Sequence, residues 1–301
     1  MSDKRVIILG ITGMLGHTLF RRLSRCIGLA VYGTARSAKG FSRWFPNVHP
    51  EQVKTGVHAE DFDSITQSVA DIQPDIVINA IGIIKQVPAA KDPLKAIAIN
   101  ALLPHRIALV CKMTNARLIH VSTDCVFSGN KGGYAENDIA DAPDLYGRTK
   151  LLGEVTYPHC ITLRTSIIGH ELRGEHGLVE WFLAREGKVR GFTNAVFSGL
   201  PTVELARVIA EYVIPSKDLN GLYHVSSSPI SKYDLLKLIA DCYRLPITIE
   251  PVETPSYDKT LNSTRFRRAT GYQPPGWPKL IDAMYGDYTS VPHHTQKNRG
   301  E

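Results

Sequence analysis

The sequence predicts an α/β fold, a doubly wound parallel sheet followed by a small C-terminal lobe. Three observations support this. A short apolar strand opens the chain and runs directly into a glycine-rich turn. Strand-like and helix-like segments then alternate through the first two-thirds of the 301 residues, which is typical of parallel strands joined by right-handed crossovers. Finally, Tyr146 and Lys150 are four residues apart, so they share one face of a helix.

The first strand and turn predict a dinucleotide site. Arg5–Leu9 is apolar and β-branched, as expected of a strand buried on both faces. The turn after this strand has a glycine at every third position. Glycines at this spacing let the backbone turn tightly and approach a pyrophosphate, while the next helix points its N-terminus at the phosphates. The expected cofactor contacts in this turn are Gly10, Thr12, Gly13, Met14, Leu15 and Gly16.

The second strand, Leu29–Ala35, ends at Arg36. An acidic residue at this position would bind the ribose 2′-hydroxyl of NAD, whereas an arginine suits the 2′-phosphate of NADP. Arg36 therefore favours NADPH. NADH remains an alternative, and Lys39 or Arg43 could also meet the phosphate.

The remaining elements follow from hydrophobic period and end signals. Asp92 and Pro93 are typical of an N-cap and the first residue of a helix. Pro104 should kink the helix that begins there. Ser231 should cap a later helix. Further strands are expected near Gln52–Val57, Ile76–Ala80, Leu118–Ser122, Cys160–Arg164, Ala195–Ser198, Gly221–Val225 and Ile247–Ile249. Further helices are expected at Asp63–Ile72, Tyr146–Val155, Leu178–Glu186, Val203–Val213 and Lys232–Tyr243.

The pattern divides the chain into three parts. Residues 1–166 form the dinucleotide-binding domain, and residues 167–288 form a smaller lobe with some segments returning to the main sheet. Residues 289–301 are polar and show no hydrophobic period, so a disordered tail is expected there.

Composition places the chain among ordinary globular proteins, with 43% hydrophobic and 21% charged residues. No signal peptide and no run of about eighteen apolar residues is seen, so no membrane segment is expected. The five cysteines lack C-x-x-C spacing, which argues against zinc and disulfides and fits a cytoplasmic location. The net charge of +6 favours anionic ligands, but no basic stripe with interleaved aromatic residues indicates nucleic acid.

Five motifs occur together in one order: Gly10-x-x-Gly13-x-x-Gly16, Asn79–Gly82, Ser122–Gly129, Tyr146-x-x-x-Lys150 and Leu163–Ser166. From Val6 to about Tyr285 the chain resembles the extended short-chain dehydrogenase/reductases, and within them the dTDP-4-dehydrorhamnose reductase-like (RmlD-like) group. The resemblance implies a catalytic triad of Thr123, Tyr146 and Lys150.

In that triad Thr123 would bind the substrate oxygen, and Tyr146 would donate a proton as hydride arrives from NADPH. Lys150 would hold the nicotinamide ribose. A nearby ammonium should also bring the phenol pKa down from its reference value of ~10. The implied substrate is a dTDP- or UDP-linked 4-keto-6-deoxyhexose, reduced at its ring ketone for deoxysugar and surface polysaccharide synthesis.

The resemblance also implies the remaining contacts. Further cofactor contacts are Asp61, Ala80, Ile81, Gly82, Asn100, Ser122, Arg164 and Thr165, together with Tyr146 and Lys150. Substrate contacts are Lys85, Thr123, Asp124, Cys125, Ser166, Thr202 and Asn262. His170 and Glu171 are weaker candidates at the edge of the pocket.

Two departures from the family pattern matter. Related dehydratases carry an acidic pair after the triad threonine, and Asp124-Cys125 lacks the second carboxylate, which disfavours a dehydratase. Cys125 also replaces an aromatic residue usual in rhamnose-pathway reductases. The resemblance leaves two alternatives open, a nucleotide-sugar epimerase or epimerase-reductase, and a non-catalytic NADP-binding subunit like the methionine adenosyltransferase regulatory subunit. It also allows a homodimer.

Overall fold

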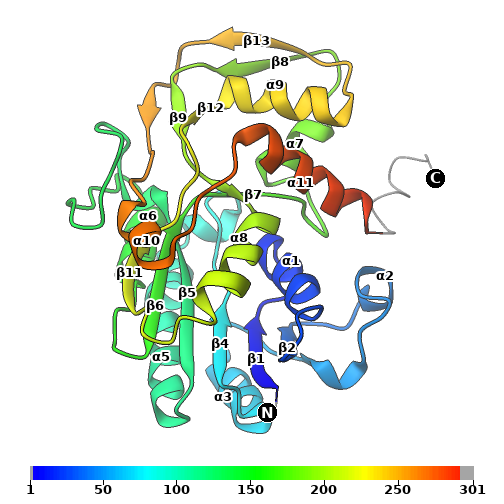
Figure 1. The fold of residues 1–301 in the computed structure, drawn as a ribbon, viewed down its shortest axis with the longest axis vertical. Helices are drawn as coiled ribbons and strands as arrows, with labels where there is room; N and C mark the ends of the chain where they lie inside the picture. Colours follow the sequence, from blue (N-terminus) through cyan, green and yellow to red (C-terminus); the bar gives the residue numbers. More distant parts are fainter. Residues whose placement is uncertain (1–2, 292–301) are drawn as a thin grey trace.

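The computed structural model describes residues 3–291 and contains a seven-stranded parallel sheet in the order β11-β6-β5-β4-β1-β2-β3 (Figure 1). Its strands are β1 (Lys4–Leu9), β2 (Leu29–Ala35), β3 (Val53–Thr55), β4 (Ile76–Asn79), β5 (Arg117–Thr123), β6 (Cys160–Thr165) and β11 (Gly221–His224). The strand order reverses between β1 and β4, so the predicted doubly wound α/β fold is confirmed. One edge strand, β11, comes from the second part of the chain.

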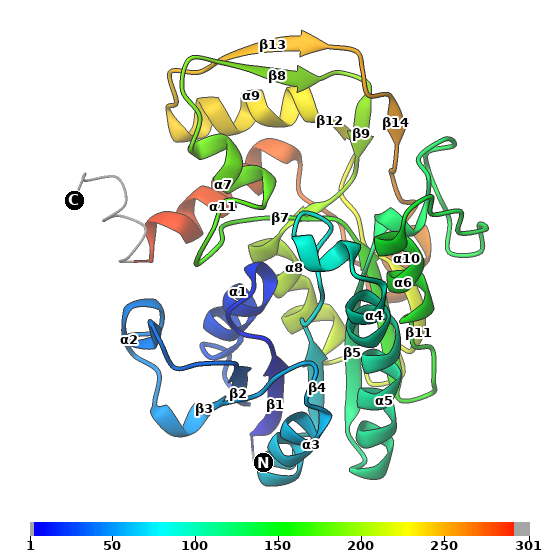
Figure 2. The ribbon, with the colours of Figure 1, turned by 180° about the vertical axis from the view of Figure 1, so that it is seen from behind.

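Helices cover both faces of this sheet (Figures 1 and 2). The sequence alternates accordingly: Val6 and Ile8 point to one hydrophobic cluster, whereas Ile7 and Leu9 point to the other. On the first face lie α1 (Met14–Leu23) and α8 (Thr202–Val208), and on the second α3 (Phe62–Ile72), α5 (Leu103–Met113) and α6 (Leu145–Leu152).

The predicted helix after Asp92 forms with an irregular middle. Asp92 caps α4 (Pro93–Ala96) by accepting from the Leu94 amide at 3.0 Å, as predicted. A π-helical stretch, η3 (Ile97–Leu102), joins α4 to α5. The irregularity falls where Pro104 was expected to disturb the helix, because proline has no N–H for the carbonyl four residues earlier.

By length and composition this helical stretch, Pro93–Met113, could cross a membrane, with a mean hydropathy of 1.4, but half of that apolar window is buried. No other stretch within residues 3–291 meets the same test. The buried side chains include Leu103 and Ile107, which pack against the sheet. The apolar character of Pro93–Met113 therefore fits a core helix.

The C-terminal lobe covers the edge of the sheet where its strands end (Figure 1). Its strands form small sheets: β12-β9-β14 (Ile230–Ser231, Ala195–Phe197, Tyr257–Asp258), β13-β8 (Thr248–Val252, Lys188–Phe192) and β10-β7 (Leu200–Pro201, Ile167–Ile168). Its helices are α7 (Leu178–Leu183), α9 (Lys232–Tyr243), α10 (Thr264–Thr270) and α11 (Trp277–Thr289). Short elements complete the fold: α2 (Phe41–Trp44), η1 (Pro50–Gln52), η2 (Pro88–Lys91), η4 (Asp124–Val126) and η5 (Ile209–Val213).

Most predicted elements lie within a few residues of their observed bounds. Ser231 caps α9 by accepting from the Asp234 amide at 3.0 Å, as predicted. The sequence analysis missed β8, α10 and α11. Thr289, the first residue of the predicted tail, is instead the last residue of α11. Residues 292–301 of that tail lie outside the described residues.

Candidate active site

The glycine turn after β1 has the geometry expected for a pyrophosphate. Gly10 has φ = +86°, a conformation that favours glycine, and a Cβ at Gly16 would collide with the Gly10 carbonyl. Gly13 is the N-cap of α1 and offers no side chain to its amides. The N–H groups of the first turn of this ten-residue helix are therefore left for an anion.

The end of β2 carries the charge predicted there. Arg36 and Lys39 are exposed. Arg173, from the segment after β7, donates to the Lys39 carbonyl at 2.7 Å and lies 4.2 Å from the Trp44 ring. These contacts hold the loop after β2 against the second half of the chain, with cationic side chains where the adenosine ribose of a dinucleotide is expected.

Thr123 and Tyr146 meet at the carboxyl end of the sheet. Thr123 is the last residue of β5, and its Oγ1 accepts from the Cys125 amide at 3.1 Å. Asp144 caps α6 by accepting from the Gly147 amide at 2.8 Å. A side chain at Gly147 would collide with the Cys125 carbonyl, so this glycine lets α6 approach η4 closely. The approach places the Tyr146 phenol beside the Thr123 side chain.

Burial dominates the acidity of Tyr146. Loss of water raises the pKa of the phenol well above its ordinary value, and the neighbouring Thr123 hydroxyl, which favours the phenolate, offsets only part of this effect. The expectation that Lys150 would lower this pKa is therefore wrong for this structure. The phenol keeps its proton at neutral pH and can act as a proton donor.

Lys150 lies buried one turn along α6 from Tyr146. Its Nζ donates to the Val121 carbonyl at 2.9 Å, which directs the amine toward β5. Burial lowers the pKa of Lys150 to about 8, while nearby Glu154 opposes the shift. The cause is desolvation, the same effect that raises the pKa of Tyr146.

Glu154 organises the buried side of this helix and was missed by the sequence analysis. It accepts from Arg164 Nε at 2.7 Å and Nη2 at 2.6 Å, and from Ser122 Oγ at 2.7 Å. Arg164 Nη1 also lies 3.3 Å from His224 Nε2. The side chains of Ser122 and Arg164 are thus committed to Glu154, and their predicted cofactor contacts stay predictions. Glu154 lies four residues after Lys150, and this helical spacing is the sequence signal that could have identified it.

Several predicted substrate residues come together beside Tyr146. Thr123 Oγ1 donates to Asp124 Oδ1 at 3.2 Å, and burial raises the pKa of the Asp124 carboxyl. Cys125 follows, and burial raises the pKa of its thiol to about 11. Lys85 pairs with Asp144, the cap of α6, at 2.6 Å.

Two lysines of the C-terminal lobe affect the same carboxyl. Lys232 and Lys259 both lower the pKa of Asp124 through their charge. Both lysines are more than a hundred residues from Asp124 in the sequence, and they flank the small sheet β12-β9-β14.

The structure gives other predicted residues structural contacts. Asp61 caps α3 by accepting from the Ser64 amide at 3.4 Å. Asn100 bonds both backbone groups of Ile83, at 2.9 and 3.1 Å. The Thr18 hydroxyl donates to Thr202 at 3.1 Å, between α1 and α8.

Three more predicted substrate or cofactor residues show mainly local bonds. Exposed Asn262 accepts from the Thr264 amide at 3.0 Å. Thr165 donates to the carbonyl of neighbouring Ser166 at 3.2 Å. The roles predicted for them remain predictions. Ala80, Ile81 and Gly82 follow β4, and a Cβ on Gly10 would lie 3.0 Å from Ile81, which places this segment against the glycine turn.

His170 and Glu171, the weaker pocket-edge candidates, are instead buried. His170 bonds Glu180 and Tyr243, each at 2.7 Å. Glu171 accepts from the His176 and Gly177 amides. Both side chains thus stabilise the segment after β7.

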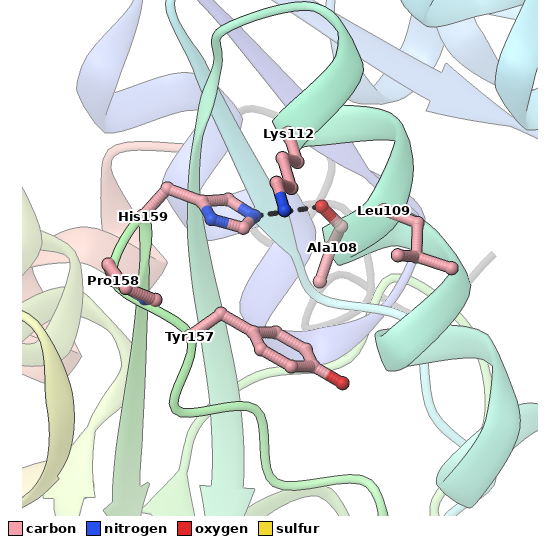
Figure 3. A pocket seen from close by; sticks show the side chains of 6 residues that line it. All are labelled: Ala108, Leu109, Lys112, Tyr157, Pro158 and His159. Atoms are coloured by element: carbon pink, nitrogen blue, oxygen red, sulfur yellow. Dashed lines mark hydrogen bonds between the residues drawn. The ribbon is translucent and has the colours of Figure 1, made fainter.

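A hollow of about 400 Å³ lies away from this site (Figure 3). His159 closes one side of it by donating to the Ala108 carbonyl at 2.8 Å. It is lined by Ala108, Leu109, Lys112, Tyr157, Pro158 and His159. Because His159 directly precedes β6, the hollow is at the opposite end of the strands from Thr123. Within residues 3–291, no group of three or more His, Cys, Asp or Glu side chains could hold a metal ion.

Comparison with known proteins gives a consistent family. The RmlD substrate binding domain matches residues 4–289. The chain is 28% identical to the spore coat polysaccharide biosynthesis protein SpsK of Bacillus subtilis, over 92% of this chain and 95% of that one. It is 27% identical to methionine adenosyltransferase 2 subunit beta of Danio rerio, over 81% of this chain and 75% of that one.

It is also 27% identical to dTDP-4-dehydrorhamnose reductase of Escherichia coli, over 77% of this chain and 88% of that one. Among solved structures, dTDP-4-dehydrorhamnose reductase from Bacillus anthracis in complex with NADP has a TM-score of 0.74 and 21% identity, over 95% of this chain and all of that one. At that identity the likeness is one of fold.

Proposed function

The chain belongs to the RmlD substrate binding domain family, and we propose that it is an NADPH-dependent reductase of a nucleotide-linked 4-keto-6-deoxyhexose. It has the fold of the sugar-nucleotide reductases and epimerases. The observation that carries the proposal is the juxtaposition of Thr123 and Tyr146 at the carboxyl edge of the sheet, with buried Lys150 one turn along the same helix as Tyr146. Open α/β sheets bind their ligands at this edge.

The residues that would hold the cofactor fit NADPH. The uncapped amides at the start of α1 suit its pyrophosphate, and exposed Arg36 suits its 2′-phosphate. When bound there, NADPH would supply the hydride for the ring ketone. The same residues would tolerate NADH with the loss of one ionic contact.

The chain itself supplies the proton. The Tyr146 phenol is protonated at neutral pH, since burial only moves its pKa further above the ordinary value, and it can donate to the oxygen of the ketone as negative charge develops there. The Thr123 hydroxyl, which donates to Asp124 in this structure, would turn to hold the same oxygen. No second carboxylate follows Asp124, and a plain reduction needs none.

The likeness to methionine adenosyltransferase 2 subunit beta favours one second candidate, a regulatory subunit that binds NADP without turnover. The set of buried Thr123, partly buried Tyr146 and buried Lys150 argues against it, because a binding module does not require a proton donor at this position.

The test is NADPH oxidation, followed by absorbance, over a panel of dTDP-, UDP- and GDP-linked 4-keto-6-deoxy sugars. We expect turnover with at least one of them. Tyr146→Phe should keep its affinity for NADPH and lose turnover by a factor of about 10² to 10⁴, the usual contribution of a positioned proton donor. NADPH binding without oxidation across the panel would favour the regulatory subunit. Turnover by the Phe variant at the wild-type rate would remove Tyr146 as the donor.

A further inference from the structure

Three side chains of α6 and the turn after it, spaced four residues apart, face the end of β5. Tyr146 lies beside the last residue of that strand, and the Lys150 amine donates to the Val121 carbonyl at 2.9 Å. Glu154, four residues further on, accepts from the Ser122 hydroxyl at 2.7 Å. Residues at this spacing share one face of a helix, so a single face meets three consecutive residues of β5.

The Glu154 carboxylate is held from two strands at once. Its side chain is 7% exposed, and that of Arg164 in β6 is 5% exposed. Arg164 Nε donates to Oε1 at 2.7 Å and Nη2 donates to Oε2 at 2.6 Å, a paired geometry that fixes both groups. The Ser122 hydroxyl donates to the same Oε1, and Ser122 is the direct neighbour of Arg164 across the two strands.

The network continues into the second half of the chain. Arg164 Nη1 lies 3.3 Å from His224 Nε2, and His224 Nδ1 lies 2.9 Å from the Tyr134 carbonyl. A ring nitrogen that faces a carbonyl has to donate, so Nδ1 carries the proton and Nε2 accepts from Arg164. Burial and the charge of Arg164 lower the pKa of His224 to about 4, which keeps the ring neutral. Glu154 is thus fixed through β5, β6 and β11, which are neighbours in the sheet (Figure 1).

The direction of the Lys150 amine depends on this arrangement. Among residues 3–291 the Val121 carbonyl is the only hydrogen-bond acceptor of that amine. An amine on a long side chain with one acceptor keeps its direction only while the strand that carries the acceptor is fixed relative to the helix. Ser122, the very next residue of the strand, is where Glu154 makes that connection.

A buried ion pair is weak evidence for stability, because both ions lose their water. Its firm geometry is the more useful property here, because it joins the two elements that carry the reactive groups. We propose that Glu154 is a positioning residue: through Ser122 and Arg164 it fixes the end of β5 against α6 and so directs the Lys150 amine. The inference rests on the proposed function, in which Lys150 holds the nicotinamide ribose.

The experiment begins with binding, without turnover. NADP⁺ and 2′,5′-ADP are titrated by calorimetry into the full chain. Ser122→Ala removes the donor in β5 and leaves the pair of Glu154 and Arg164 intact. Glu154→Gln is combined with Arg164→Met, because removal of one partner alone would leave a buried charge unpaired.

The loss of affinity should be confined to the nicotinamide end of the cofactor. NADP⁺ should bind about tenfold more weakly to the double variant and about threefold more weakly to Ser122→Ala, the range expected when one hydrogen bond is lost. 2′,5′-ADP has no nicotinamide ribose for Lys150 to hold, so it should bind both variants like the wild type. A purely structural role would weaken both ligands equally.

Turnover provides the second readout. In the NADPH assay kcat should fall about tenfold in the double variant, because a small displacement of the groups around the reacting atoms is costly. The KM for the sugar nucleotide should stay near the wild-type value, since none of the substituted side chains is expected to hold the nucleotide.

Ser68→Ala is the matched control. Ser68 and Ser122 are both 4% exposed, and the Ser68 hydroxyl donates to the Ser64 carbonyl within α3 at 2.8 Å. Ser68→Ala should keep both affinities and the turnover of the wild type. If the double variant shows no cooperative thermal transition, Ser122→Ala decides the question alone.

Failure of the positioning role and failure of the proposed function look different. A loss specific to NADP⁺, in a chain that oxidises NADPH with no 4-keto sugar, would keep the positioning role and reject the reductase. Wild-type NADP⁺ affinity and kcat in Ser122→Ala would overturn the positioning role and leave the reductase intact. An equal loss of NADP⁺ and 2′,5′-ADP would also overturn it, because Glu154 would then serve the stability of the fold alone.

Discussion

Lys150 combines a buried position with an amine that loses its proton near pH 8, well below the usual range of a lysine. Its pKa is lowered to about 8 because water is excluded, and the bond to the Val121 carbonyl fixes the direction of the amine. Such a lysine weakens the folded state at any pH where it must carry its charge.

The stability of Lys150→Met should therefore depend on pH. The pKa is lower in the folded than in the unfolded chain, where it is 10.5, so the folded state binds fewer protons between about pH 8 and 10.5. Wild-type stability gains from this group as pH rises through that window. The Met variant, which lacks the penalty, should be more stable at pH 7 by up to about 3 kcal/mol.

That advantage should shrink as the pH approaches 10.5 in thermal melts recorded across the window, with Lys237→Met as the exposed control. A constant difference between the two proteins from pH 7 to 10 would show that desolvation of the amine is not its source. The same Met substitution should lower turnover in the NADPH assay.

For single residues, the sequence predicted where the reactive groups lie but not the direction of their pKa shifts. The spacing of Tyr146 and Lys150 predicted a shared helix face, and Thr123 was predicted at the strand end. The direction of the Tyr146 pKa was wrong because it depends on burial by distant segments, which spacing does not reveal. Lys232 escaped prediction for the same reason.

Among the elements, α6 depends on a close approach to η4. Gly147→Ala would put a methyl group against the Cys125 carbonyl and 2.7 Å from the Ala142 side chain. We expect α6 to shift, which would cost about 1–3 kcal/mol of stability and separate Tyr146 from Thr123. Turnover should fall more than NADPH affinity does.

Gly286→Ala is the matched control, because nothing lies within 4 Å of a methyl group at that position in α11. It should raise stability by about 0.5–1 kcal/mol, the usual gain from replacing glycine within a helix. If both alanines gave the same stability and turnover, the packing argument for Gly147 would fail.

The elements that the sequence predicted well have strong local signals. The strands β1, β4 and β6 are short apolar runs, and Asp92 and Ser231 mark helix starts by their cap chemistry. The elements it missed lack them. β8 is a five-residue strand of a two-stranded sheet, and α10 buries Phe266 alone. Their formation depends on tertiary contacts rather than on local pattern.

In the whole molecule, the loop after β5 ties the two halves together. The Asp258 amide donates to the Gly129 carbonyl at 2.7 Å, and the Tyr134 amide donates to the Thr260 carbonyl at 2.9 Å. Thr260 Oγ1 accepts from the Gly133 amide at 2.7 Å. Tyr134 and Leu261 also share a small hydrophobic cluster.

Thr260→Val should loosen this tie without changing shape, because it removes only the acceptor for the Gly133 amide. We expect a loss of about 1 kcal/mol, faster amide exchange at Gly133, and weaker UDP binding with unchanged NADP⁺ affinity. Thr264→Val, at an exposed position of α10, is the control. Unchanged exchange at Gly133 would argue against the tie.

The edge strand β11 has a consequence for protein synthesis. Its residues, Gly221–His224, pair with β6 only after the intervening lobe segments have been translated. A nascent chain that had left the ribosome only as far as β6 would thus expose the unpaired edge of a strand that is fully buried in the finished fold. At 5–20 residues per second, the usual rate of synthesis, that edge would stay open for several seconds. Folding of this enzyme should accordingly be completed late, when the C-terminal half emerges.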